Sequence, residues 1–154
     1  MRAVVQRVSR ASVSAEGREV ANIARGFLVL VGIAADDTPA MAGKLATKVA
    51  GLRIFEDAEG RMNLGLADVG GEILCVSQFT LYGDVRRGRR PSFDAAAPGD
   101  AALPRYDAFC AAIESTGIAC HRGAFGEHMN VDLTNDGPVT LILDSRDLDT
   151  PRRS

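Results

Sequence analysis

The sequence predicts an α+β fold, in which a mostly antiparallel or mixed β-sheet curls into a barrel-like shape and two main helices pack on it. Several short stretches are rich in β-branched residues or alternate apolar with polar residues, which is typical of strands. Only two stretches space their apolar residues three and four positions apart, which is typical of helices. Strands and helices do not alternate along the chain, so a regular βα architecture is disfavoured.

The first part of the chain predicts a hairpin and a central strand. Residues 3–13 are rich in valine with interleaved polar residues, so they predict one strand or two short ones. Glu16 and Gly17 are a turn signal, after which residues 18–23 can return as the hairpin partner. Residues 27–33, with the sequence FLVLVGI, are continuously apolar, which indicates a strand buried on both faces.

Two helices are predicted, and each has one apolar face with which to cover the sheet. Thr38 can cap the first helix and Pro39 suits its first position, while Gly51 is expected to end it. Its apolar face is predicted to contain Met41, Leu45, Val49 and Leu52. The second helix is predicted at residues 103–116, with Gly117 as its C-terminal stop. Its apolar face is predicted to contain Leu103, Tyr106, Phe109, Cys110 and Ile113.

The other strands are short, and polar segments separate them. They are predicted at residues 54–55, 64–66, 72–82, 118–122, 129–134 and 139–143. Residues 84–98 are predicted to form a loop, and residues 135–138 (NDGP) a turn. Residues 144–154 are polar and are expected to fray. No repeat, linker or composition shift divides the chain, so residues 1–154 are expected to form one domain.

The composition indicates an ordinary globular chain. The 154 residues are 46% hydrophobic and 25% charged, and the net charge of −2 argues against a globally basic nucleic-acid binder but allows a local basic patch. Three widely spaced cysteines favour apolar fillers in a reducing compartment over a disulfide framework or a zinc site. Because no signal-peptide pattern and no membrane-spanning run are found, a cytoplasmic location is expected.

Residues 75–82, with the sequence CVSQFTLY, hold the strongest chemical signal. An apolar run at residues 73–76 predicts a buried strand, and the polar side chains of Ser77, Gln78 and Thr80 follow it. A strand that becomes polar before a loop is a common place for reacting groups, because the sheet fixes the backbone while the side chains reach solvent. The alternative is a half-exposed strand whose hydroxyl groups only cover its outer face.

The absence of common catalytic motifs restricts the chemistry. The chain contains no G-x-S-x-G nucleophile motif, no P-loop and no G-x-G-x-x-G segment that opens a helix. His121 and His128 are the only histidines, and neither has ligand-like spacing, so both are interpreted as surface or structural residues. No metal and no cofactor is therefore predicted. Catalysis is expected to depend on backbone hydrogen-bond donors and on groups that the substrate supplies.

Two motifs that occur in a fixed order point to a family. They are SQFTLY at residues 77–82 and NDGPVT at residues 135–140, with GAFGEHM at residues 123–129 between them. Together with the start MRAVVQRV and the piece RPSF at residues 90–93, they resemble the D-aminoacyl-tRNA deacylase family over the whole chain. A related deacylase family looks similar but carries threonine in place of Ser77, so Ser77 favours the former.

The resemblance implies an enzyme that hydrolyses the ester between a D-amino acid, or glycine mischarged on tRNA-Ala, and the terminal adenosine of tRNA. It also implies a homodimer, in which the Gly137-Pro138 turn of one subunit, with a cis bond, enters the pocket of the other. Main-chain carbonyl groups of this turn would face the α-ammonium group of the substrate, so an L side chain would collide with the turn. The implied partners are aminoacyl-tRNA, through its 3′-terminal adenosine, and a second copy of the chain, with no membrane and no DNA.

The resemblance also assigns roles to particular residues. The implied catalytic residues are Ser77, Gln78, Phe79 and Thr80. The implied substrate-binding residues are Gly137, Pro138, Phe125 and Met129. Arg7 is expected to support the turn. The residues expected to offer positive charge to tRNA phosphates are Arg86, Arg87, Arg89 and Arg90, although this loop could also be only solvated.

The mechanism and the function each keep alternatives. The backbone N–H groups of Gln78, Phe79 and Thr80 are expected to stabilise the tetrahedral oxyanion. Because no base is identified for the Thr80 hydroxyl, attack by a water assisted by the ribose 2′-hydroxyl is favoured over attack by Thr80. Two other functions stay open, a dimeric RNA-binding domain without turnover and a general small-ester hydrolase that needs no tRNA.

Overall fold

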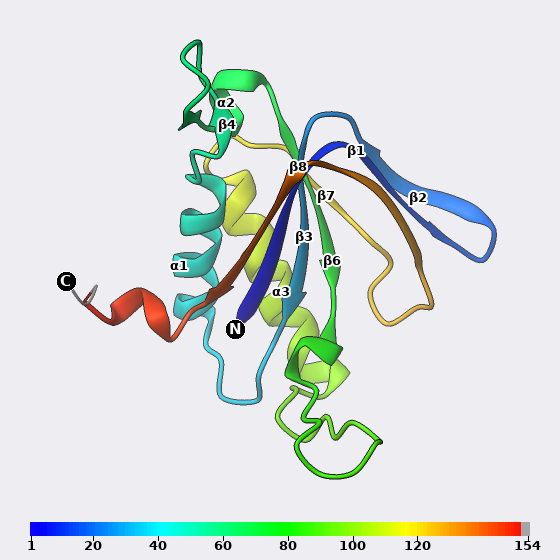
Figure 1. The fold of residues 1–154 in the computed structure, drawn as a ribbon. Coiled ribbons are helices and arrows are strands. Elements are labelled where there is room, and N and C mark those ends of the chain that lie inside the picture. The colour runs from blue at the N-terminus through cyan, green and yellow to red at the C-terminus, as the bar shows by residue number, and fades with distance from the viewer. Residues whose placement is uncertain (152–154) are drawn as a thin grey trace.

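The computed structural model describes residues 1–151, which form a curled six-stranded sheet with two long helices packed against it (Figure 1). The strand order is β2-β1-β3-β6-β7, and β8 also pairs with β1. The strands of this sheet are β1 (Arg2–Ala15), β2 (Arg18–Ile23), β3 (Gly26–Gly32), β6 (Glu72–Ser77), β7 (Cys120–Arg122) and β8 (Asn130–Asp144). The pairs that β1 makes are antiparallel, whereas β6 runs parallel to both β3 and β7. The predicted α+β class with a mixed, barrel-like sheet is confirmed.

β1 is the long strand about which the sheet curls. Its first half lies between β3 and β8, and its second half lies between β2 and β8. Buried and half-exposed side chains alternate over most of its length, which is the pattern of a strand with one face in the core. The valine-rich stretch is therefore one continuous strand rather than two short ones.

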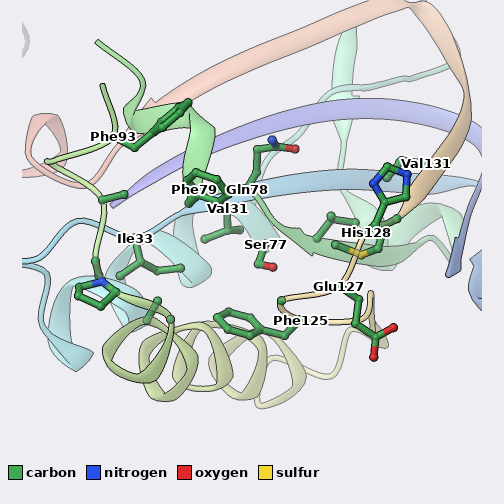
Figure 2. A pocket seen from close by; sticks show the side chains of 18 residues that line it. Val31, Ile33, Ser77, Gln78, Phe79, Phe93, Phe125, Glu127, His128 and Val131 are labelled. Atoms are coloured by element: carbon green, nitrogen blue, oxygen red, sulfur yellow. The ribbon is translucent and has the colours of Figure 1, made fainter. Parts of the chain in front are cut away.

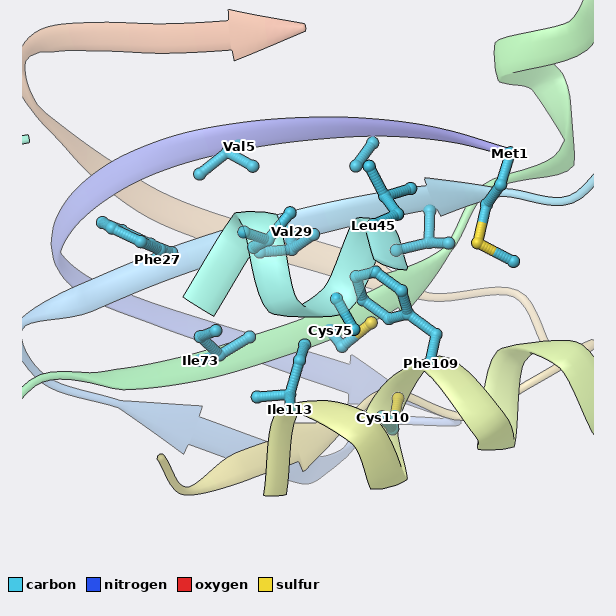
Figure 3. Packing of buried hydrophobic residues seen from close by; sticks show 14 of the residues in the cluster. Met1, Val5, Phe27, Val29, Leu45, Ile73, Cys75, Phe109, Cys110 and Ile113 are labelled. Atoms are coloured by element: carbon cyan, nitrogen blue, oxygen red, sulfur yellow. The ribbon is translucent and has the colours of Figure 1, made fainter. Parts of the chain in front are cut away.

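The helices α1 (Pro39–Ala50) and α3 (Gly99–Glu114) contact each other and cover one face of the sheet (Figure 1). The shorter elements are β4 (Phe55–Glu56), β5 (Met62–Leu64), α2 (Leu66–Val69) and the 3-10 turns η1 (Phe79–Tyr82) and η2 (Asp147–Asp149). Figure 3 shows Leu45 of α1 and Phe109 of α3 among the buried side chains of β3 and β6, such as Val29 and Cys75. Burial of one such large apolar side chain stabilises a fold by roughly 1.5–3 kcal/mol.

Helix α1 has the predicted caps but a different buried face. The Thr38 hydroxyl accepts a hydrogen bond from the Met41 N–H at 3.3 Å, and Gly51 follows the last residue of the helix. The buried side chains are Ala42, Leu45, Ala46 and Val49. Met41 and Leu52, which were predicted to be on this face, are only half-buried. Ala42 and Ala46 occupy the buried face in their place.

Helix α3 begins four residues before the predicted start. It includes Gly99 and Asp100, which resemble loop residues in the sequence, and an acidic residue in the first turn suits the helix dipole. Leu103 is 40% exposed, so its predicted place in the core is wrong. The predicted core residues that are buried are Tyr106, Phe109, Cys110 and Ile113. The helix ends at Glu114, and Gly117 follows with a left-handed φ of 89°.

Two predictions near the motifs need correction. The strand predicted at residues 72–82 ends at Ser77, because the chain then closes into the 3-10 turn η1. Residues 135–138 do not form a turn between two strands, since β8 continues through them and stays paired with β1 on both sides. The pairing register shifts opposite residues 6–10, so this segment is a bulge within one strand.

The residues that directly follow β8 pack against the start of the chain. Ser145 is buried, and its N–H donates to the Met1 carbonyl at 2.8 Å, while η2 follows two residues later. Residues 152–154 of the tail that was expected to fray lie outside the described residues. No helix within residues 1–151 is long and apolar enough to cross a membrane.

Candidate active site

A pocket of about 580 Å³ opens where β6 passes into η1 (Figure 2). One wall is formed by residues 76–79, a second by residues 96–99 at the start of α3, and a third by residues 125–129. Val31 and Ile33 from the end of β3 lie between them. The walls are mainly apolar, and Figure 2 shows the Ser77 hydroxyl directed toward the space between them. Segments far apart in the sequence therefore meet at one end of the sheet.

The sheet fixes the backbone at this end of the pocket. Ser77 is the last residue of β6 and pairs with Val31 of β3. The Gln78 N–H donates to the Val31 carbonyl at 2.8 Å, which extends the parallel ladder by one residue. The chain then turns sharply into η1, so Phe79 is presented at the surface with 57% of its area exposed. A rigid strand thus places a short exposed turn beside the pocket.

The start of η1 offers main-chain hydrogen-bond donors. The N–H groups of Phe79 and Thr80 precede the first closed bond of the 3-10 turn, so the turn gives them no acceptor. Within the described part of the chain, no other group accepts from them either. The Gln78 N–H, which was predicted as a third donor, is engaged by Val31 and is not available. Two adjacent free N–H groups can stabilise an oxyanion.

The side chain of Thr80 lies beside this turn but does not line the pocket. It is exposed, and its hydroxyl oxygen accepts a hydrogen bond from the Gln78 side-chain amide. An amide N–H cannot take a proton from a hydroxyl group, so this contact does not activate Thr80 as a nucleophile. The other three predicted catalytic residues, Ser77, Gln78 and Phe79, line the pocket.

Phe125 and Met129, which were predicted to bind the substrate, line the opposite wall. The ring of Phe125 packs on Tyr106 of α3, with centroids 5.5 Å apart. The Tyr106 hydroxyl in turn donates to the Cys75 carbonyl at 2.9 Å. Burial of this hydroxyl raises the pKa of Tyr106 well above the ordinary value. The Gly123 N–H donates to the same carbonyl at 2.9 Å. The wall is therefore fixed to β6 two residues before the site.

Gly123 also allows Met129 to reach the pocket. A Cβ atom at Gly123 would lie 3.0 Å from the Met129 sulfur and 3.6 Å from a methyl group of Val76. Any larger residue at position 123 would therefore displace the side chain that forms this part of the wall.

Several lining residues were not predicted. Phe93, in the predicted loop of residues 84–98, lines the pocket and packs edge-on against Phe79, with ring centroids 5.1 Å apart. Glu127 and His128 also line the pocket, and His128, which was interpreted as a surface or structural residue, is exposed (Figure 2). The signals for these three residues were their places within the RPSF and GAFGEHM pieces.

The Gly137–Pro138 bond is cis, and both residues are exposed. The Arg7 side chain binds the residue before this bond: its Nε donates to the Asp136 carbonyl at 3.0 Å. Its Nη1 donates to the Ile54 carbonyl at 2.7 Å. This arginine is 5% exposed, so its contacts are sheltered from water. Gly137 has a φ of 131°, and a Cβ atom there would lie 2.7 Å from a Val139 methyl carbon.

The Asn135 side chain closes the same segment from the other side. Its carbonyl oxygen accepts from the Val139 N–H at 3.1 Å, and its amide group donates to the Thr140 hydroxyl at 3.0 Å. The segment is therefore rigid as well as exposed. Gly137 and Pro138 do not line the pocket of their own chain, so the structure does not bring these two predicted substrate-binding residues together with Ser77.

The arginine loop is closed at its base and charged at its tip. Asp84 and Ser92 exchange two backbone hydrogen bonds of 2.7 and 2.9 Å. Arg86 makes a bidentate contact with the Asp84 carboxylate, and this contact lowers the pKa of Asp84 to about 2. The exposed arginines of this loop are Arg86, Arg87, Arg89 and Arg90, and the pocket lining includes none of them.

A pocket with mainly apolar walls beside a turn with free main-chain N–H groups is the arrangement expected of an enzyme that cleaves an acyl bond. Comparison with known proteins gives the family. A sequence model of the D-Tyr-tRNA(Tyr) deacylase family matches residues 4–144, and the chain therefore belongs to this family of hydrolases.

Similar proteins match over nearly their whole length. A protein of Koribacter versatilis named D-aminoacyl-tRNA deacylase is 58% identical over 146 residues, which cover 95% of this chain and 98% of that protein. A Thermus aquaticus protein of the same name is 57% identical, with 94% and 95% covered. A solved structure named c-Myc DNA Unwinding Element Binding Protein is 41% identical, with a TM-score of 0.87 over 94% of this chain and 98% of that one.

Proposed function

We propose that this enzyme hydrolyses the ester bond of D-aminoacyl-tRNA and releases free tRNA and the D-amino acid. The observation that carries the proposal is the pair of unengaged N–H groups of Phe79 and Thr80 beside the pocket. The family membership supports an aminoacyl-tRNA substrate. Since the ester joins an amino acid to the terminal adenosine, the pocket must accept a flat base and place the ester at η1.

The apolar pocket suits the terminal adenosine. A purine ring and its ribose fit well within about 580 Å³, and Phe125 and Met129 offer the aromatic and soft apolar contacts that a base prefers. The Ser77 hydroxyl is directed into this pocket, where it can orient the ribose and the ester. The ester carbonyl would then point toward the start of η1.

The reaction would proceed through attack of water on the ester carbonyl carbon. The carbonyl oxygen becomes an oxyanion that accepts hydrogen bonds from the Phe79 and Thr80 N–H groups. The ribose 2′-hydroxyl lies next to the reacting ester in the substrate itself, so it can assist the water and the departing 3′-oxygen. Thr80 would position Gln78 rather than attack, because its hydroxyl accepts from that amide and contacts no base.

A second copy of the chain would complete the site. Gly137 and Pro138 are exposed and rigidly held, yet they have no role in their own pocket. They lie in β8, an edge strand of the described sheet, and Ile142 further along this strand is 79% exposed. In a homodimer, the segment of one subunit would enter the pocket of the other and direct its main-chain carbonyl groups at the substrate's α-ammonium group.

This arrangement would select by exclusion. A backbone segment held by Arg7 cannot rotate away as a side chain can, so an L side chain would collide with it. A D side chain would point away from the segment, and glycine would have nothing to exclude. We therefore expect activity on glycine mischarged on tRNA-Ala as well as on D-aminoacyl-tRNA, in the cytoplasm where translation occurs.

The arginine loop would contact tRNA phosphates. Its tip carries exposed guanidinium groups, and Phe93 connects it directly to the pocket. Arg87, Arg89 and Arg90 are better suited to this role than Arg86, whose charge is already paired with Asp84.

A deacylation assay tests the proposal. Labelled D-Tyr-tRNA, L-Tyr-tRNA and D-tyrosine ethyl ester are incubated separately with the protein, and amino acid release is followed. We expect rapid release from D-Tyr-tRNA alone. Binding of tRNA without release would favour the RNA-binding domain, and equal cleavage of the simple ester without stereochemical preference would favour the small-ester hydrolase.

A further inference from the structure

We propose that Arg2 is a positioning residue for this reaction, because it fixes the turn η1 whose N–H groups stabilise the oxyanion. The inference rests on the proposed function. Arg2 begins β1, and Figure 1 shows that this end of β1 and the chain just after β6 lie at the same end of the sheet. Arg2 does not line the pocket, so any effect on the reaction must act through the turn.

Three contacts fix the guanidinium group of Arg2. Its Nη1 donates to the Leu81 carbonyl at 2.9 Å. Its Nε donates to the Asp144 carboxylate at 3.2 Å, which ties it to the end of β8. Its central carbon lies 4.6 Å from the centre of the Tyr82 ring, within the range of a cation–π contact. The side chain therefore connects both β1 and β8 to the last residues of η1.

The carbonyl that Arg2 binds has a specific place in the turn. Leu81 lies near the end of η1, where carbonyl groups have no later N–H within the turn to accept from. A cation at this end also complements the dipole of the turn. Because η1 has only four residues, the position of the Leu81 carbonyl limits where the Phe79 and Thr80 N–H groups can point.

The backbone of β3 supports the same turn from the other side. Gly32 is the pairing partner of Arg2 in the antiparallel ladder. A Cβ atom at Gly32 would lie 3.0 Å from the Leu81 Cβ, 3.1 Å from the Gln78 carbonyl oxygen and 3.2 Å from the Tyr82 ring. The turn η1 thus packs directly on the backbone of β3 at Gly32, and the side chain of Arg2 from the neighbouring strand β1 binds it.

Arg2 and Arg7 both lie on β1, and each supports a different task of the proposed site, the chemical step for Arg2 and the choice between D and L substrates for Arg7. Arg7 binds the carbonyl before Gly137, and Arg2 binds the carbonyl near the end of η1. Loss of Arg7 should impair the choice between D and L substrates. Loss of Arg2 should impair the chemical step without altering that choice.

The test compares Arg2→Met, Arg2→Lys and Arg10→Ala in the full-length protein. Arg10 lies on the same strand, is exposed and makes no side-chain hydrogen bond or ion pair within the described residues, so it controls for a lost charge. We expect kcat for D-Tyr-tRNA to fall about ten- to hundredfold in Arg2→Met, because small displacements of catalytic donors are costly. KM and the ratio of D to L rates should stay within twofold, and Arg2→Lys should recover part of kcat.

The outcomes separate this inference from the proposed function. Absence of deacylation by the unmodified protein would refute the proposed function. An active protein whose Arg2→Met variant keeps its kcat, or loses kcat only together with KM and the D-to-L ratio, would overturn the role of Arg2. If Arg2→Met does not fold, as judged by circular dichroism, Arg2→Lys decides: lowered kcat at unchanged thermal stability supports the inference, and unchanged kcat refutes it.

Discussion

Under the proposed function, the catalytic turn (residues 77–82) and the selector segment (residues 135–138) both act through main-chain groups, N–H donors in the first and carbonyl acceptors in the second. The catalytic turn has two free N–H donors beside the pocket of its own chain, which suits a developing negative charge. In the selector segment, Arg7 binds the Asp136 carbonyl, and the exposed residues Gly137 and Pro138 do not line that pocket. Under the proposed function, one segment acts within its own chain, whereas the other needs a second copy to act on a substrate.

The difference shows why the two segments are fixed by different devices. The catalytic turn continues a buried parallel ladder, so the sheet itself supplies most of its rigidity. The selector segment interrupts the ladder between β1 and β8, where a bulge has lost its regular pairing. Side chains replace that pairing, with Arg7 on one side and Asn135 on the other. A substitution at Arg7 should therefore damage the selector far more than the turn.

Replacement of Arg7 by Met is expected to have the largest effect. It leaves the part-buried Asp136 carbonyl and the buried Ile54 carbonyl without their donor, and one unpaired buried group costs about 1–3 kcal/mol. We expect the free energy of unfolding to fall by about 2–4 kcal/mol. The preference for D-Tyr-tRNA over L-Tyr-tRNA should also fall at least tenfold, because a loosened segment yields to an L side chain.

Urea denaturation and paired deacylation rates measure these two effects. Arg10→Ala removes a charge from the exposed face of the same strand and should change neither quantity. If Arg7→Met retained full stereochemical preference while losing stability, Arg7 would support only the fold.

Replacement of Gly32 by Ala is expected to affect the catalytic turn instead. The new Cβ atom would lie 3.0–3.2 Å from three atoms of residues 78–82, so the turn must move by a few tenths of an ångström. We expect kcat to fall about tenfold, with the D-to-L ratio unchanged. Gly43→Ala is the matched control, because that glycine lies in α1 with nothing near its Cβ position. It should stabilise the protein by about 0.5–1 kcal/mol and leave kcat unaltered.

Much of the fold could be predicted because its signals are local. Periodicity located both main helices, and the apolar run at residues 27–33 located the central strand. The bulge in β8 could not be predicted, because NDGP has the same composition whether it ends a strand or interrupts one. Only its pairing with β1 distinguishes the two cases, and that pairing spans more than 120 residues of sequence. The start of α3 was missed for a similar reason, since Gly99 and Asp100 resemble loop residues.

The candidate site was predicted from motifs rather than from local chemistry. Those motifs placed Ser77, Phe125 and Met129 around one pocket. Phe93 was missed because its role depends on a loop that returns to Phe79. The unavailability of the Gln78 N–H could not be predicted either, since it follows from the ladder between β6 and β3 continuing one residue beyond the strand.

Replacement of Thr80 by Val tests whether the turn needs a nucleophile. Valine keeps the shape of threonine and the main-chain N–H, but it removes the hydroxyl that accepts from Gln78. We expect kcat to fall less than tenfold, because the oxyanion donors remain. Loss of all turnover with unchanged tRNA affinity, together with an acyl-Thr80 adduct detected by mass spectrometry in the unmodified enzyme, would show instead that Thr80 attacks directly.

The smallest effect on chemistry is expected from the exposed arginines of the arginine loop, because they do not line the pocket. Replacing Arg87, Arg89 and Arg90 together by Ala should leave turnover at saturating substrate unchanged and raise KM. The plot of log affinity for tRNA against log salt should become less steep by about 2–3, since each lost phosphate contact removes close to one from the slope. Arg86→Ala should change the slope less, because Asp84 already neutralises this charge in the free protein and the pair must separate before binding. An unaltered slope in the triple variant would place the tRNA phosphates elsewhere on the surface, and the bound acceptor end would then depend on the pocket and the selector segment alone.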